Sequence, residues 1–200
     1  MVGTQTNLAT AVWPITTGIP LPRATANSTD QFVLLEDGNP VPAQFSIRAT
    51  WYPNRQIKWL GLDFLARYEK GKPRDYRLKV LPEGKTEPAP PSSLRVEESD
   101  DFITVETGKL RFKVNRKKFT GIEEAWLADK SGKYDQSLVR GEGGPWLVDE
   151  RGERFEASQD SNASITVEEK GPVRVTIYAT GWYVSAKTKE KLCIFKTRIS

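Results

Sequence analysis

Apolar and polar residues alternate along residues 44–51, QFSIRATW, and a mostly apolar run, IKWLGLDFL, follows at residues 57–65. A period of two predicts a half-buried strand, and an apolar run of this length predicts a strand that crosses a core. The turn-forming residues Pro53 and Asn54 lie between the two segments. The pattern therefore predicts a β-hairpin at the centre of a β domain. A helix is the alternative, but Pro53 interrupts its periodicity.

Shorter strand patterns surround this hairpin. Residues 11–13 predict a first short strand, and residues 14–23, which contain three prolines and a glycine, predict an extended loop. Residues 31–36 and 76–80 predict two further strands, and Asp37-Gly38 is a strong signal for a tight hairpin turn. The first part of the chain is therefore expected to be a small β domain.

A proline-rich segment follows this first domain. Residues 82–93, PEGKTEPAPPSS, show no apolar periodicity, and such a composition is typical of a semi-rigid linker. We therefore predict a first domain at residues 1–82, a linker at residues 83–93 and a second domain at residues 94–200.

The second half repeats the alternation typical of strands, with turn signals between the segments. Its last strand pattern runs to the end of the sequence without a closing turn. Strands at this spacing predict a β-sandwich, here an incomplete antiparallel one. The fold class is thus all-β, a small barrel followed by a sandwich. The segments predicted as strands are residues 102–106, 110–114, 119–127, 146–148, 165–169, 173–183 and 192–199.

The composition excludes several classes of protein. No apolar run reaches the ~20 residues of a membrane helix, and the N-terminus lacks the features of a signal peptide. The chain has 30 Lys and Arg against 26 Asp and Glu, a net charge of +4. This balance suits a nucleic acid, an acidic polysaccharide or simply a solvated surface. Because the basic residues form no dense run, we expect no nucleic-acid partner and no membrane partner.

Residues that commonly carry chemistry are scarce. The chain has no histidine and a single cysteine, Cys193, whose strand-like surroundings predict a small buried side chain. A cysteine nucleophile without histidine is not expected, and the usual zinc ligands are missing. Adjacent acid pairs such as Glu123-Glu124 point to opposite faces of a strand and do not converge on one bond. We therefore predict no catalytic residue, no metal and no cofactor.

Sugar binding is the better-supported chemistry. Exposed Trp side chains offer flat apolar surfaces to sugar rings, and Arg binds carboxylates in a bidentate manner. The candidate substrate-binding residues are Arg23, Trp51, Trp146 and Trp182. Packing remains the alternative role for each tryptophan, and pinning the proline-rich loop is the alternative role for Arg23. Trp59, within the predicted central strand, is assigned to the core.

The order of several motifs resembles the N-terminal region of the exo-rhamnogalacturonan lyase-like (PcRGLX/YetA-like) family. In the first half they are residues 18–23, GIPLPR, residues 35–44, LEDGNPVPAQ, and residues 57–64, IKWLGLDF. In the second half, residues 105–112 and 169–174 look like the start of the family's sandwich. One departure is that residues 52–56, YPNRQ, replace the family's usual Asp-Gly-Ser turn.

The resemblance implies a small Greek-key barrel of the RIFT type, followed by a β-sandwich and then by a helical catalytic domain absent from these residues. The chain is accordingly expected to be a non-catalytic scaffold of a polysaccharide lyase-like protein. Its partners would be an acidic, pectin-type polysaccharide and the catalytic domain, in an extracellular or periplasmic location. A free-standing carbohydrate-binding or cell-surface module is the alternative.

Overall fold

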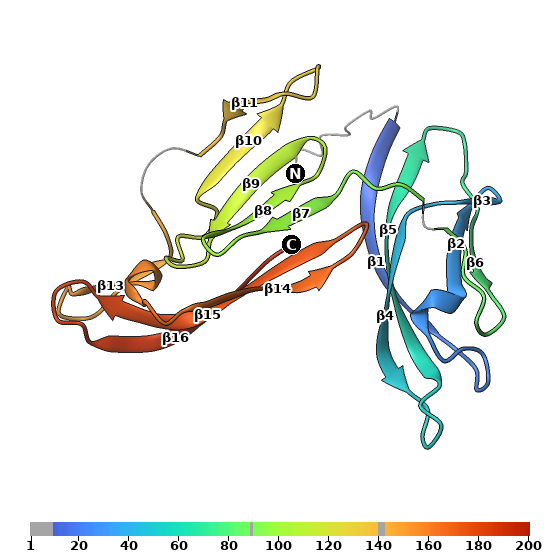
Figure 1. Ribbon diagram of the computed structural model, residues 1–200, viewed down its shortest axis with the longest axis horizontal. Helices are drawn as coiled ribbons and strands as arrows, with labels where there is room; N and C mark the ends of the chain where they lie inside the picture. The colour runs from blue at the N-terminus through green and yellow to red at the C-terminus, as the bar shows by residue number, and fades with distance from the viewer. Residues whose placement is uncertain (1–9, 89, 140–142) are drawn as a thin grey trace, which may run out of the picture. The chain divides into compact units, whose positions relative to one another are not determined.

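The computed structural model describes residues 10–88, 90–139 and 143–200 and shows an all-β protein built from antiparallel sheets (Figure 1). The chain divides into two compact units, Met1–Ser92 and Ser93–Ser200. Each unit has a hydrophobic core of its own. The predicted all-β class is confirmed.

The N-terminal unit consists of two three-stranded sheets that together form a half-barrel. A short 3-10 helix, η1 (Thr29–Gln31), leads into the second sheet. The first sheet has the order β1 (Thr10–Pro20), β5 (Ile57–Glu69), β4 (Ala43–Thr50). The second has the order β3 (Asn39–Pro40), β2 (Phe32–Glu36), β6 (Tyr76–Val80).

The central hairpin is formed as predicted. Strands β4 and β5 pair in antiparallel register, with Phe45 opposite Leu62. Leu60, Leu62 and Phe64 alternate along the buried face of β5. The predicted Asp37-Gly38 turn is also confirmed, because both residues have positive φ (50° and 86°), as a tight hairpin turn requires.

Three predictions for the N-terminal unit are wrong. The expected buried and wet faces along residues 44–51 are not observed, because Gln44 is buried and Ile47 is 47% exposed. Residues 14–20 belong to strand β1 rather than to a loop, since β1 is an edge strand and an edge tolerates Pro14 and Pro20, which lack an N–H. Trp59 is not in the core. It lies on the opposite face of β5 from Leu60, is 44% exposed, and covers Gly18, where any Cβ would clash with the indole.

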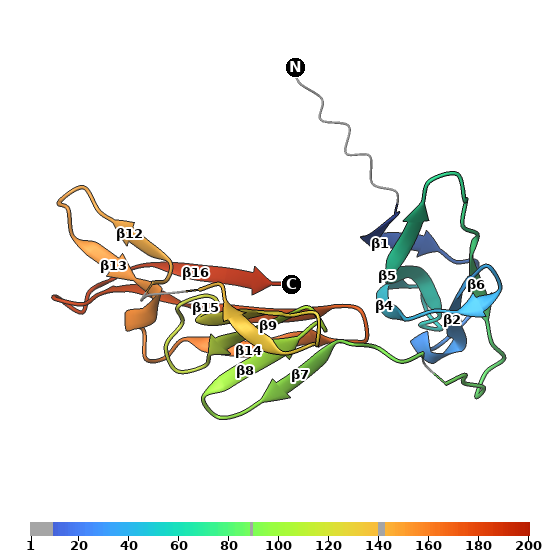
Figure 2. The same ribbon diagram turned by 90° about the horizontal axis from the view of Figure 1, so that it is seen from above.

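The C-terminal unit is a sandwich of two antiparallel sheets, which Figures 1 and 2 show as layers. The first sheet has the order β11-β10-β9-β8-β7. Its strands are β7 (Arg95–Glu98), β8 (Phe102–Glu106), β9 (Leu110–Asn115), β10 (Glu124–Ala128) and β11 (Tyr134–Ser137).

The second sheet has the order β12-β13-β15-β14, and β16 pairs with the long strand β15. The β12–β13 hairpin projects from one end of the unit (Figure 2). A second 3-10 helix, η2 (Ala157–Gln159), follows β13. The strands are β12 (Trp146–Val148), β13 (Arg154–Glu156), β14 (Ser164–Lys170), β15 (Val175–Ser185) and β16 (Lys191–Ile199).

The sandwich core joins the two sheets through aromatic packing. Phe119 is fully buried and stacks on Phe195 of β16, with the ring centroids 5.2 Å apart. The predicted strand over residues 119–127 therefore starts only at Glu124: Phe119 turns into the core, and Gly121 has a positive φ of 83°.

The prediction of a buried Cys193 is wrong, because the thiol is exposed. The register between β15 and β16 shifts between Trp182 and Val184, and Cys193 lies at this irregularity. The register shift of a neighbouring strand is a tertiary feature that the apolar sequence around Cys193 does not encode.

Candidate functional site

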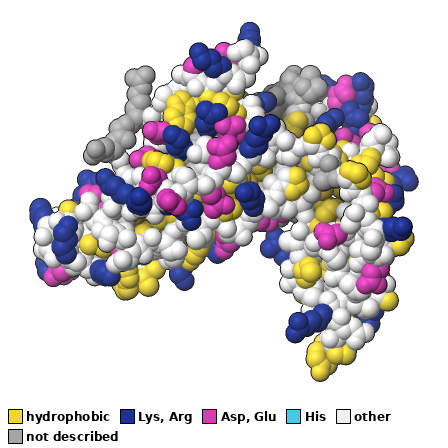
Figure 3. Space-filling model, viewed as in Figure 1, with side chains coloured by type: hydrophobic (Ala, Val, Ile, Leu, Met, Phe, Trp, Pro, Cys, Tyr) yellow, Lys and Arg dark blue, Asp and Glu magenta, His cyan; other side chains and the backbone are white. Residues whose placement is uncertain are grey.

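The end of the β4–β5 hairpin carries a cluster of basic and aromatic residues. Arg23 and Lys58 both lie over the ring of Trp51, each 4.6 Å from the ring centroid. Tyr52, at the end of the hairpin, is 87% exposed, and Arg55 is exposed in the same turn. We call Arg23, Trp51, Tyr52, Arg55 and Lys58 the basic tip. Basic and hydrophobic side chains lie together at this end of the unit in Figure 3.

Hydrogen bonds hold residues 21–24, the loop that follows β1, against the end of the β4–β5 hairpin. The Trp51 indole Nε1–H donates to the carbonyl oxygen of Leu21 at 3.1 Å, and Arg23 Nη1 donates to the carbonyl oxygen of Tyr52 at 3.1 Å. The backbone N–H of Ala24 donates to Gln56 Oε1 at 2.9 Å. These contacts bring the predicted residues Arg23 and Trp51 together, a contact that the sequence pattern does not predict.

 Arg23 follows β1 and Trp51 follows β4, so the cluster depends on the packing of two separate segments.

The charge of the basic tip is not balanced by nearby acids. Residues 38–62 contain Arg48, Arg55 and Lys58 but no Asp or Glu. Within the part of the chain that the structure describes, Arg23, Arg55 and Lys58 form no ion pair with a carboxylate. The basic tip is therefore a group of three cations, two of them held by Trp51, that can attract an anionic ligand.

The stacking changes the role that the sequence suggested for Trp51. Its ring is occupied by the guanidinium of Arg23 and the ammonium of Lys58, an arrangement stabilised by the negative face of the aromatic ring. Trp51 thus holds two cations at fixed positions, while Tyr52 presents the open aromatic ring.

The other two candidate tryptophans lie in the sandwich unit, each with a cation of its own. Trp146 on β12 is 53% exposed, and the guanidinium of Arg154 lies 4.9 Å from its ring centroid. Trp182 on β15 is 36% exposed, and the ammonium of Lys191 lies 5.6 Å from its ring centroid. The four predicted residues are therefore divided between the two units.

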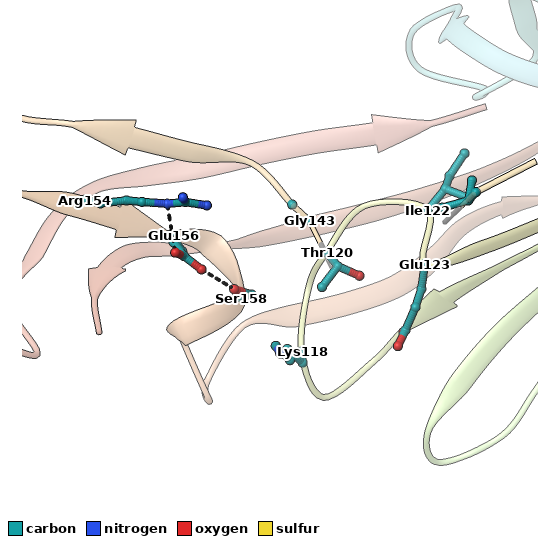
Figure 4. Close-up of a pocket in the computed structure, with 10 residues that line it drawn as sticks. Lys118, Thr120, Ile122, Glu123, Gly143, Arg154, Glu156 and Ser158 are labelled. Carbon is teal, nitrogen blue, oxygen red and sulfur yellow. Dashed lines mark hydrogen bonds and ion pairs between the residues drawn. The ribbon is translucent and has the colours of Figure 1, made fainter. Parts of the chain in front are cut away.

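A cleft of about 530 Å³ opens in the sandwich unit close to the Trp146–Arg154 stack. One side is the loop between β9 and β10, and the other is β13 with the following 3-10 helix (Figure 4). Its lining is mostly polar and consists of Lys118, Thr120, Ile122, Glu123, Val139, Gly143, Gly144, Arg154, Glu156 and Ser158.

The β9–β10 side of the cleft is anchored at both ends. Asn115 Oδ1 accepts hydrogen bonds from the backbone N–H groups of Lys117 and Lys118, at 2.9 and 3.0 Å. The N–H of Glu123 donates to the carbonyl oxygen of Lys113 at 2.9 Å. Phe119 fixes the middle of the loop in the core. The backbone of this wall is therefore held in place by the fold.

The β13 side is a chain of polar contacts. Arg154 Nε lies 2.9 Å from Glu156 Oε1, and Ser158 Oγ donates to Glu156 Oε2 at 3.2 Å, as the dashed lines in Figure 4 show. With Trp146 on its other side, Arg154 is held by both an ion pair and an aromatic ring. Its orientation is fixed by these two neighbours.

Two polar atoms on the β9–β10 wall lack partners. Thr120 Oγ1 and Glu123 Oε2 are buried, and neither has a hydrogen-bond partner among the described residues. Buried polar atoms are usually satisfied, because leaving one without a partner costs about 1–3 kcal/mol. These atoms mark the cleft as a second candidate site.

Neither candidate site has the residues of a metal centre. In the described ranges, no group of three or more Cys, Asp or Glu side chains is arranged to hold a metal ion. The same residues contain no helix long and apolar enough to cross a membrane.

Comparison with known families addresses the sandwich unit directly. Residues 94–200 match the family described as the PcRGLX-like protein central beta sandwich domain. The chain belongs to the PcRGLX-like family. No curated protein matches the sequence. The family resemblance predicted from the sequence motifs is confirmed for the sandwich, while residues 1–93 lie outside the matched region.

Sequence reasoning missed several residues of this PcRGLX-like chain. Lys58 was only part of an apolar strand pattern, and Glu123 belonged to an adjacent acid pair. The pairing of β10 with β9 gives one clue to the direction of the Glu123 side chain. Glu124 lies opposite Lys113 and forms an ion pair with it at 3.2 Å. Once Glu124 is assigned to that face, its neighbour Glu123 must face the other way.

Proposed function

We propose that this chain is the non-catalytic front region of a polysaccharide lyase-like protein that acts on an acidic, pectin-type polysaccharide. The observation that carries the proposal is the family match of residues 94–200 to a central sandwich domain. A domain described as central has neighbours on both sides in its family. In this proposal the N-terminal unit is the RIFT-type barrel, and the chemistry belongs to a separate catalytic domain.

The basic tip supports contact with an acidic glycan. Uronate carboxylates need cations, and an Arg guanidinium binds them through two parallel hydrogen bonds. Arg23 and Lys58 are already positioned by Trp51, so less side-chain entropy is lost when they bind. Tyr52 supplies an exposed ring for the apolar face of a sugar.

The proposed division of labour follows from the chemistry of a lyase. Such an enzyme must remove the proton next to a uronate carboxylate, which requires a base within hydrogen-bond reach of that proton and a cation that neutralises the carboxylate. The basic tip offers the cations for substrate contact. The proposal assigns the base to the catalytic domain, which the two units of this chain would brace.

An NMR titration with trigalacturonate tests the glycan contact. We expect weak binding, with a Kd of about 1 mM, that shifts the indole N–H signal of Trp51. The variant Arg23→Gln/Lys58→Gln should lose this response. The control variant Arg95→Gln/Lys109→Gln, which removes two exposed cations of the sandwich unit, should keep it.

Two other outcomes would contradict the proposal. Micromolar binding by the chain alone would favour the free-standing carbohydrate-binding module. Release of unsaturated uronate from pectic polysaccharide by the chain alone, followed by ultraviolet absorbance, would show that it is itself a lyase.

A further inference from the structure

The cleft in the sandwich unit differs from the basic tip because its lining contains buried polar atoms without hydrogen-bond partners. Glu123 Oε2 is a buried acceptor, and Thr120 Oγ1 is a buried group that can accept or donate. Neither has a partner among the described residues. Both atoms are closed to solvent in this conformation, so a ligand with several hydroxyl groups would satisfy them once the Thr120 and Glu123 side chains, which line the cleft, turn toward it.

The charges that line the cleft cancel. Arg154 is paired with Glu156 at 2.9 Å, and the remaining charged side chains of the lining are Lys118 and Glu123. An anionic ligand would gain the attraction of Lys118 but would meet the carboxylates of Glu123 and Glu156. A neutral ligand avoids this repulsion and can still accept a hydrogen bond from Lys118 Nζ.

The size and shape of the cleft fit a small ligand. Its volume of about 530 Å³ lies within the ~300–1,000 Å³ typical of small-molecule sites. Ile122 and Val139 add apolar surface to the polar lining. A polar lining with a small apolar surface matches the hydroxyl groups and the C–H face of a sugar ring.

We propose that this cleft is a binding site for a neutral sugar unit. The side chains of Glu123 and Thr120 turn toward the cleft and accept hydrogen bonds from ligand hydroxyls, and Lys118 Nζ donates to a ligand oxygen. Ile122 contacts the C–H face of the ring. This proposal rests on the proposed function only for the choice of a sugar as the ligand with several hydroxyl groups. The cleft shares no residue with the basic tip.

A substitution at Gly144 is a second way to disturb the cleft. Its φ is 149°, and a Cβ at this position would lie 3.1 Å from the Cα of Thr120. Neighbouring Gly143 has open space around it, with no atom within 4 Å of a Cβ placed there. Gly144→Ala, strained by both its positive φ and the Cα of Thr120, should therefore shift this wall and weaken ligand binding, whereas Gly143→Ala is the neighbouring control with neither strain.

The test is an NMR titration of the full chain with rhamnose, galactose and arabinose, with galacturonate as the acidic probe. We expect at least one neutral sugar to shift the backbone signals of Thr120 and Glu123, and Glu123→Gln to weaken its binding on the order of tenfold. Glu124→Gln, which changes the ion-paired neighbour on the opposite face, should leave the affinity unchanged.

Thermal melts of the same variants separate a binding role from a structural one. Glu123→Gln should melt at the same temperature as the parent chain or higher, because it removes a buried carboxylate oxygen without a partner. A lower Tm together with unchanged sugar affinity would overturn the proposal.

Three binding results would also overturn it: no neutral sugar shifts the cleft signals, galacturonate binds there more tightly than any neutral sugar, or Glu123→Gln and Glu124→Gln bind equally well. Acidic binding at the basic tip is read separately from the Trp51 indole signal. An absence of sugar binding in the cleft is therefore distinguishable from an absence of acidic-glycan binding at the basic tip, on which the proposed function depends.

Discussion

The basic tip and the sandwich cleft use opposite arrangements of charge. At the tip, Arg23, Arg55 and Lys58 have no carboxylate partner among the described residues, and Trp51 holds two of them in place. In the cleft, Arg154 forms an ion pair with Glu156, and the lining contains one further cation, Lys118, and one further carboxylate, Glu123. The tip thus carries three cations without paired carboxylates, whereas the charged side chains that line the cleft sum to zero.

This difference sets what each site can select. Exposed cations attract anions over a range that salt controls, since the Debye length is about 8 Å at 0.15 M ionic strength. Buried hydrogen-bonding atoms act only at contact distance, and they favour ligands whose donors match the unpaired acceptors. We therefore expect the tip to recognise charge and the cleft to recognise hydroxyl geometry.

The largest expected effect is a loss of stability that is confined to the sandwich unit. Phe119→Ala removes a fully buried ring that stacks on Phe195 and anchors the cleft wall. Deleting a buried Phe side chain costs about 3–5 kcal/mol, so the free energy of unfolding of the sandwich unit should fall by about that amount. Denaturant unfolding measures the loss. The Trp51 indole signal should remain, because the N-terminal unit has a separate core.

The second prediction reverses the charge of the tip. Arg23→Glu/Lys58→Glu replaces two cations with two anions, so uronate carboxylates should be repelled and binding of polygalacturonate should fall at least tenfold. Affinity gel electrophoresis with polygalacturonate in the gel measures the effect. Arg95→Glu/Lys109→Glu makes the same change of net charge elsewhere, and equal losses in the two variants would show that only net charge matters.

The sequence predicts those parts of both units that depend on local pattern. The strand over residues 44–50 and the Asp37-Gly38 turn are predicted correctly, because strand formation and turn dihedrals are properties of short segments. The faces of that strand are not, since Gln44 is buried and Ile47 is 47% exposed. Trp59 and Cys193 are misassigned because their exposure depends on a neighbouring strand. Trp59 covers a glycine on β1, and Cys193 lies at a register shift against β15.

The candidate sites follow the same rule. Arg23 and Trp51 are recognised by residue type, but their stacking depends on how the loop after β1 packs on the hairpin. The cleft is invisible in the sequence, because its walls come from the β9–β10 loop and from β13. Glu123 gains its significance only from the absence of a described partner for a buried oxygen, which requires the fold.

The third prediction uses salt to separate the two sites within one protein. Raising the ionic strength from about 0.01 M to about 0.15 M shortens the Debye length from about 30 Å to about 8 Å. Binding of trigalacturonate at the tip should weaken severalfold, whereas binding of a neutral sugar in the cleft should stay nearly constant. NMR titrations at the two ionic strengths measure both. Equal salt dependence at the two sites would contradict the comparison.

The smallest effect is expected at an ion pair outside both sites. Arg198 donates two hydrogen bonds to Glu168, at 2.6 and 2.7 Å, and these bonds lower the pKa of Glu168 below its ordinary value. A carboxyl whose pKa is lowered by folding stabilises the protein above its unfolded pKa, and this contribution is lost as the pH falls through the folded pKa.

Arg198→Gln should therefore reduce the Tm slightly at neutral pH, because exposed ion pairs contribute little, and still less in strong acid, where only the contact of Arg198 with the Tyr178 ring is lost. Melts across the acid range measure this. Sugar binding at either site should be unaffected, which makes Arg198→Gln the reference for surface charge that serves neither the tip nor the cleft. A loss of trigalacturonate binding in this variant would mean that anions are attracted by the whole surface, and the contrast between a charged tip and a neutral cleft would then no longer hold.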